Sequence, residues 1–174
     1  KYFKFDITND HFFFFILNFF NNEICNSKFE NMNKCYLNYC LEINTQIKKN
    51  GTFNSNLNFE KQRELYSKID NNTFNEIWVF QKSLPLNERK DTLKYLDLNY
   101  EGKYRNFINE YGKENIEIKK YAESYNVSAC LSPSMFAEMT ENYELFKITK
   151  LKTKLVIAIH YLTLNDQNWR NEKY

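Results

Sequence analysis

The amino-acid sequence predicts an all-α fold, an irregular bundle of about eight helices. Glycine occurs three times and proline twice in 174 residues, whereas β-sandwiches and barrels need turn residues about every 8 to 12 residues. Apolar side chains recur at steps of three and four in several long stretches, which is the period of a helix with one buried face. No long linker or fixed-period repeat divides the chain, so we expect one helical domain over residues 1–174.

The N-terminal region combines an alternating segment with a phenylalanine-rich one. Residues 1–7 alternate apolar and polar side chains, which favours a short strand. The apolar run over 12–20 is nine residues long, whereas a membrane-spanning helix needs about 20. Acidic residues precede this run, unlike the basic start of a signal peptide. A helical projection leaves Phe14 among polar residues and places Phe15 and Phe19 on a broad apolar arc, so the segment is predicted to fill a core.

Two helices are predicted next. Ser27 opens a capping box before an apolar period that continues to residue 50, where Gly51 ends the helix. After a polar loop, residues 59–70 show the period of a second helix.

The middle of the chain is also predicted to be helical. Thr73 opens another capping box, and Pro85 ends the helix that follows it. Residues 87–98 and 100–112 carry further helical periods, the second of which ends at a glycine.

Three helices are expected in the last third. Residues 118–125 form a short one, and Ser132, followed by a proline, is a clear N-cap for a helix that continues to about residue 145. The last helix covers about 151–164. Its apolar run over 155–159 contains β-branched residues, so a buried strand is the alternative there.

Composition and missing motifs argue against several classes of function. The net charge is +2 and the pI about 8.2, whereas nucleic-acid-binding domains usually have a pI above about 9. Asparagine occurs 26 times, scattered between apolar positions, which indicates a low-GC genome rather than a prion-like region. No glycine-rich phosphate loop, zinc motif or hydrolase motif is present, so no cofactor and no metal are expected.

The four cysteines suggest reduced thiols. Cys25, Cys35, Cys40 and Cys130 contain no C-x-x-C pair, which gives little support to a zinc site. A bridge between Cys35 and Cys40 is implausible, because five residues turn a helix by about 140°. The expectation is mostly buried thiols in a cytoplasmic protein without a membrane span.

Cys130 and His160 are the residues on which a small hydrolase would depend. Cys130 precedes a helix start, where the helix dipole favours the thiolate, and a histidine is the usual base for such a nucleophile. No orienting residue or oxyanion motif accompanies the pair. A structural cysteine and a core histidine are therefore the favoured interpretation.

The candidate partner-binding residues are two tyrosines and three lysines. Tyr100 and Tyr104 belong to an aromatic stripe at helical spacing, which is usually core but can form a binding surface. Lys147, Lys150 and Lys154 are predicted to share one helical face that attracts acidic groups. The chain has 31 aromatic residues, many for one small core. The leading hypothesis is a protein-binding or self-associating module, and the alternative is a nucleic-acid-associated protein that uses the lysines.

Overall fold

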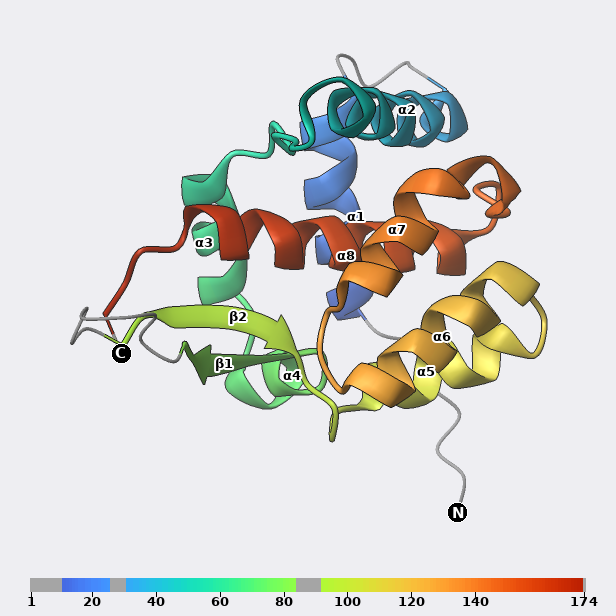
Figure 1. Ribbon diagram of the computed structural model, residues 1–174. Helices are drawn as coiled ribbons and strands as arrows, with labels where there is room; N and C mark the ends of the chain where they lie inside the picture. Colours follow the sequence, from blue (N-terminus) through green and yellow to red (C-terminus); the bar gives the residue numbers. More distant parts are fainter. Residues whose placement is uncertain (1–10, 26–30, 84–91, 174) are drawn as a thin grey trace.

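The prediction of a mostly helical fold is confirmed, with one β-hairpin added. The computed structural model describes residues 11–25, 31–83 and 92–173, and within them it has eight α-helices and one hairpin (Figure 1). The helices are α1 (His11–Ile24), α2 (Met32–Asn50), α3 (Phe59–Ser67), α4 (Asn71–Asn75), α5 (Lys103–Gly112), α6 (Ile116–Ser128), α7 (Pro133–Glu141) and α8 (Leu151–Trp169), with a 3-10 turn η1 (Tyr143–Leu145) after α7. The hairpin consists of β1 (Trp78–Lys82) and β2 (Lys94–Leu98). The strand predicted over 1–7 lies outside the described residues.

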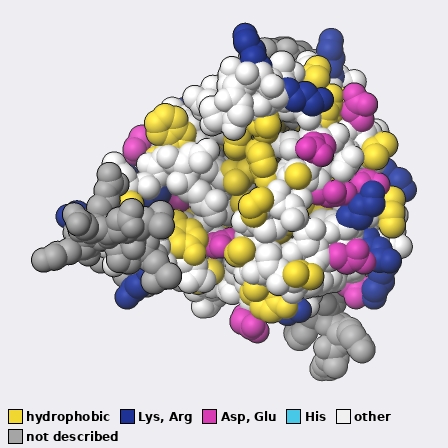
Figure 2. Space-filling model, in the orientation of Figure 1, with side chains coloured by type: hydrophobic (Ala, Val, Ile, Leu, Met, Phe, Trp, Pro, Cys, Tyr) yellow, Lys and Arg dark blue, Asp and Glu magenta, His cyan; other side chains and the backbone are white. Residues whose placement is uncertain are grey.

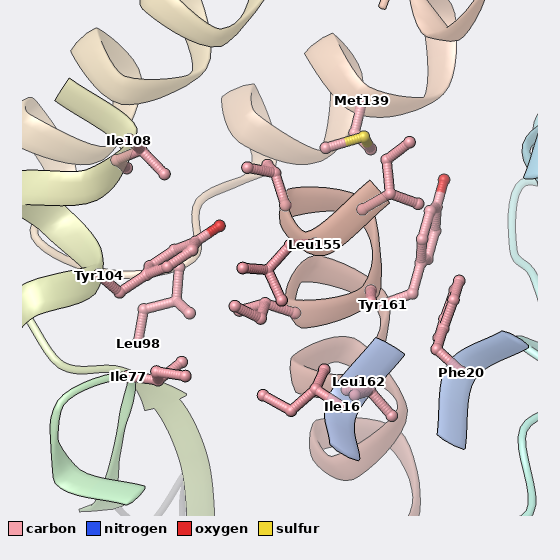
Figure 3. Packing of buried hydrophobic residues seen from close by; sticks show 14 of the residues in the cluster. Ile16, Phe20, Ile77, Leu98, Tyr104, Ile108, Met139, Leu155, Tyr161 and Leu162 are labelled. Atoms are coloured by element: carbon pink, nitrogen blue, oxygen red, sulfur yellow. The ribbon is translucent and has the colours of Figure 1, made fainter. Parts of the chain in front are cut away.

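The last helix, α8, is the centre of the fold. Every side chain from Leu155 to Thr163 is buried, as expected for a helix surrounded by others in a core. It contacts α1, α3 and β2, and Figure 1 shows it crossing the middle of the molecule with α1 behind it. Figure 3 shows Leu155 and Leu162 among apolar side chains of α1, α5 and β2. Residues 155–159 are therefore helical, and the alternative of a buried strand does not hold.

Helix α1 buries a narrower stripe than the sequence predicts. Phe15 is 58% exposed, so its predicted place in the core is wrong, whereas Phe14 is exposed as predicted, by 66%. Helix α1 contacts α2, α3 and α8, and side chains at steps of three and four along it are enough to fill these contacts. The buried side chains of α1 are Phe13, Ile16, Leu17 and Phe20. Among the described residues, no helix is long and apolar enough to cross a bilayer.

Local sequence signals set the ends of several helices. The side chain of Asn31 caps α2 and accepts hydrogen bonds from the backbone N–H of Asn33 at 3.0 Å and of Lys34 at 3.4 Å. The capping box predicted at Ser27 lies outside the described residues. Gly51 ends α2 as predicted, with φ 70° and its N–H bonded to a carbonyl of the last turn. Ser132 caps α7, also as predicted.

The prediction of two helices over residues 73–98 is wrong except for the short α4, because strands β1 and β2 lie in this part of the chain. Helix α4 ends at residue 75, and β1 and β2 then pair antiparallel, with Trp78 opposite Leu98 and Phe80 opposite Leu96. The indole Nε1 of Trp78 donates to Thr163 Oγ1 of α8 at 2.9 Å. Aromatic and β-branched residues suit a pleated surface covered by another element, and this tertiary contact outweighs the helical period. The predicted role of Pro85 lies outside the described residues.

Candidate protein-binding surface

The outer side of α1 presents two adjacent phenylalanine side chains to solvent. Phe14 is 66% exposed and Phe15 58% exposed, Asn18 and Asn22 are also exposed, and Phe19 is half-buried. These five residues are called the α1 face here. Single exposed apolar side chains are ordinary on protein surfaces, but contiguous ones indicate an interaction site.

The α1 face carries no charge. The acidic residue of α1 is Glu23, and its carboxylate is already held: it accepts from Lys61 Nζ at 3.1 Å and from the backbone N–H of Asn58 at 2.9 Å. Asn18 and Asn22 supply neutral donors and acceptors beside the phenyl rings. The face is therefore apolar with amides around it, and it has no like charges to repel a copy of itself.

The structure places Tyr100 near the surface and Tyr104 in the core. The Tyr100 ring lies 3.8 Å from the guanidinium carbon of Arg105, and its hydroxyl donates to the Asn126 carbonyl at 3.3 Å. Tyr104 is fully buried, because α5 packs this side against α6. A partner at the surface does not reach Tyr104, and the binding role predicted for it is not supported.

The three predicted lysines do not share a helical face. Helix α8 begins at Leu151, so Lys147 and Lys150 precede it, and only Lys154 is within it. The Nζ of Lys154 lies 5.7 Å from the Tyr36 ring centroid, and its partial burial lowers the pKa of the ammonium group. Figure 2 shows basic and acidic side chains interspersed on the side of this view where α5–α7 lie. The basic run therefore forms no helical row of charge for a phosphate backbone.

Cys130 and His160 do not form a nucleophile–base pair. His160 is fully buried, its Nδ1 lies 3.2 Å from the Tyr121 hydroxyl, and burial lowers the pKa of the imidazole to about 3. Among the described residues, no hydrogen bond joins it to Cys130, which is half-buried after the end of α6. His160 has a buried position in the core, as the favoured interpretation had it.

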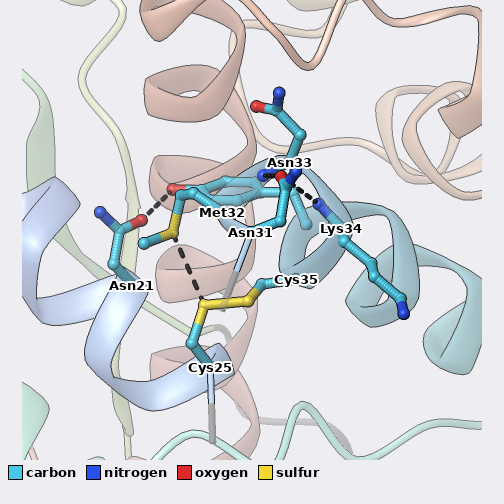
Figure 4. The surroundings of a disulfide bond; sticks show 8 residues. Asn21, Cys25, Asn31, Met32, Asn33, Lys34 and Cys35 are labelled. Atoms are coloured by element: carbon cyan, nitrogen blue, oxygen red, sulfur yellow. Dashed lines mark hydrogen bonds between the residues drawn. A yellow bond between two sulfur atoms is a disulfide. The ribbon is translucent and has the colours of Figure 1, made fainter. Parts of the chain in front are cut away.

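Two of the four cysteines form a disulfide, so the prediction of reduced thiols is wrong for them. Cys25, after α1, is bonded to Cys35 in the first turns of α2, with a Cα–Cα distance of 5.5 Å (Figure 4). Cys40 and Cys130 are free. Because Cys25 follows α1 and Cys35 belongs to α2, ten residues further on, the bond depends on how the ends of these two helices meet, and no local spacing rule predicts it.

Comparison with protein-family models, with characterised proteins and with solved structures finds no significant match for this chain. Within the described residues, no group of three or more His, Cys, Asp or Glu side chains is arranged to hold a metal ion.

Proposed function

We propose that this chain is a protein-binding module that associates with a second copy of itself through the α1 face. The observation that supports it is the adjacent exposure of Phe14 and Phe15, by 66% and 58%. Burying a phenylalanine side chain contributes about 1.5–3 kcal/mol relative to leaving it in water. An interface that covers both rings gains much of this energy.

The absence of charge on the α1 face favours a second copy as the occupant. In a two-fold symmetric dimer each patch meets the same patch of the partner. Like charges would then face each other at a cost of several kcal/mol, but Phe14, Phe15 and Asn18 carry none. Asn18 can both donate and accept, so two such side chains can pair across the symmetry axis.

The size of the patch suggests a weak dimer. Aromatic side chains bury about 150–250 Å² each, so the exposed parts of the two phenylalanines amount to roughly 250 Å² per copy. A standard interface buries about 800 Å² per partner. Neighbouring side chains would supply the rest, and we expect association at micromolar or higher concentration.

Sedimentation equilibrium across a concentration series tests this proposal. The double variant Phe14→Ser/Phe15→Ser is expected to remain monomeric where the parent chain dimerises. A matched control, Leu37→Ser/Leu41→Ser, changes two exposed leucines of α2 (40% and 49% exposed) and should dimerise like the parent. A parent chain that stays monomeric at all concentrations, or an equal effect of both double variants, would contradict self-association through α1. If the parent chain stays monomeric, binding of a different protein by the α1 face is the form of binding that remains.

Because of the disulfide, we propose a different compartment from the cytoplasm that the sequence predicts. Such bonds persist in oxidising compartments and are rare in the cytosol, so the Cys25–Cys35 bond favours an oxidising compartment over the cytoplasm that the sequence predicts. Mass spectrometry of the natural protein, alkylated before any reduction, should find the two cysteines joined and Cys40 and Cys130 alkylated after unfolding. Alkylation of all four cysteines would restore the cytoplasmic prediction.

A further inference from the structure

A polar pocket of about 580 Å³ lies between the end of α1, one side of α2 and the loop before α3. Its size is within the range of about 300–1,000 Å³ that is usual for small-ligand sites. The α2 side of the pocket includes Lys34, Asn38 and Glu42, at intervals of four residues. Ser55 and Asn56 form the loop side.

Covalent and polar ties hold each wall of this pocket in place. The Cys25–Cys35 disulfide joins α1 to α2 at one end. On the loop side, the Asn56 amide donates to Glu42 Oε1 at 3.1 Å, and the Ser55 hydroxyl donates to Asn165 of α8. The pocket is thus formed without a ligand, which reduces the entropy lost when one binds.

Three side chains along α2 retain unused hydrogen-bonding groups. Among the described residues, Lys34 Nζ has no ion pair, the Asn38 amide has no hydrogen bond, and Glu42 Oε2 has no donor. Lys34 supplies positive charge at the end of the pocket near the start of α2, where the helix dipole also favours an anion. Glu42 supplies negative charge two turns further on. Eight residues of helix separate their Cα atoms by about 12 Å.

We propose that this pocket binds a short zwitterionic peptide of about three residues. An extended chain spans at most about 3.3–3.6 Å per residue, so the free ends of a tripeptide are about 10 Å apart. Its carboxylate then lies at Lys34 and its ammonium group at Glu42. Asn38, halfway between them, pairs with a backbone amide of the peptide through its own donor and acceptor.

This pocket shares no lining residue with the α1 face, and Phe14 and Phe15, which carry the dimer proposal, lie at least eight residues before Glu23 and Ile24, the α1 residues in the pocket wall. The two proposals therefore fail independently. The variant Phe14→Ser/Phe15→Ser should bind the peptide like the parent chain.

Nuclear magnetic resonance titration with trialanine tests the proposal. Trialanine should shift the amide signals of Asn38 and Asn56, and each capped form, N-acetylated or C-amidated, should bind about two- to fivefold more weakly, the effect of an exposed ion pair. Lys34→Gln should weaken trialanine binding by a similar factor and leave the C-amidated form unaffected. Glu42→Gln should likewise weaken binding of trialanine and leave binding of the N-acetylated form unaffected. The Oε1 of the new glutamine can still accept from Asn56.

Lys48→Gln is the matched control, since Lys48 is an exposed lysine of α2 that lines a different pocket. It should leave trialanine binding unchanged. The proposal is overturned if trialanine leaves Asn38 and Asn56 unshifted, if the capped forms bind as tightly as the free peptide, or if Lys48→Gln weakens binding as much as Lys34→Gln. Far-ultraviolet circular dichroism of each variant confirms that the helices are intact.

Discussion

His160 makes the stability of this protein depend on pH. The imidazole is fully buried in α8, and burial lowers its pKa from 6.5 to about 3. In the unfolded chain the same side chain titrates near its ordinary value. Between these two pKa values the unfolded chain therefore binds a proton that the folded chain does not, and the stability of the fold decreases as the pH falls below about 6.5.

The size of the effect follows from the difference in pKa. Each unit of pH below the pKa of the unfolded state costs about 1.4 kcal/mol. At pH 5, which is 1.5 units below 6.5, the loss due to His160 is about 2 kcal/mol. This is a large part of a typical stability of about 5–15 kcal/mol.

Replacement of the histidine isolates this contribution. In the variant His160→Phe the ring can still stack on Phe136, whose centroid lies 6.2 Å from the imidazole, but it does not titrate. Urea unfolding of both proteins at pH 8 and pH 5 gives the change in stability of each. The parent chain should lose about 2 kcal/mol more than the variant.

Other titratable groups cancel in this comparison. Burial raises the pKa of the Asp97 and Asp166 carboxyl groups, and these favour the fold as the pH falls, opposite to His160. Both are present in both proteins. An equal pH dependence of parent and variant would refute the buried neutral state of His160.

Three further perturbations follow from the packing. Phe20→Ala should lower the free energy of unfolding by about 3–5 kcal/mol because it leaves a cavity in the core, whereas Phe14→Ala should change it by less than about 0.5 kcal/mol; equal urea midpoints would show that the two faces of α1 are assigned wrongly. Cys25→Ser/Cys35→Ser should lower stability by about 2–3 kcal/mol under oxidising conditions, and an unchanged midpoint would argue that the bond does not form. Arg170→Met should cost about 3 kcal/mol, since it leaves the Asp166 carboxylate buried without its partner at 2.7 Å; a variant as stable as the parent would mean that the carboxylate is protonated or solvated.

The helices could be predicted where their signals are local. Gly51 and Ser132 mark helix ends through their own backbone and side chain, and both predictions are confirmed. The β-hairpin could not be predicted in this way, because Phe74, Ile77 and Trp78 recur at helical spacing. What decides their conformation is the contact with α8, which lies about 85 residues further along the chain.

The candidate sites could be predicted from the sequence only in part. Phe15 belongs to a broad apolar arc, and only the arrangement of α2, α3 and α8 around α1 determines that it stays exposed. The Cys25–Cys35 bond depends on how two helices meet. Lys34 and Glu42 could be placed on one helix from their spacing, but the pocket beside them needs the loop around Ser55 to close it.

The central place of α8 has a consequence for synthesis of the chain. Gln62 Nε2 donates to the Leu162 carbonyl 100 residues away, and Ser55 bonds to Asn165 across 110 residues. A ribosome adds about 5–20 residues per second. The roughly 100 residues between the end of α3 and the end of α8 therefore take roughly 5 to 20 s to synthesise, and α1–α3 leave the ribosome before the helix that they cover. During that interval the apolar stripe of α1 has no complete core to enter, and a nascent chain halted before residue 151 presents Ile16 and Phe20 to chaperones that hold exposed apolar segments.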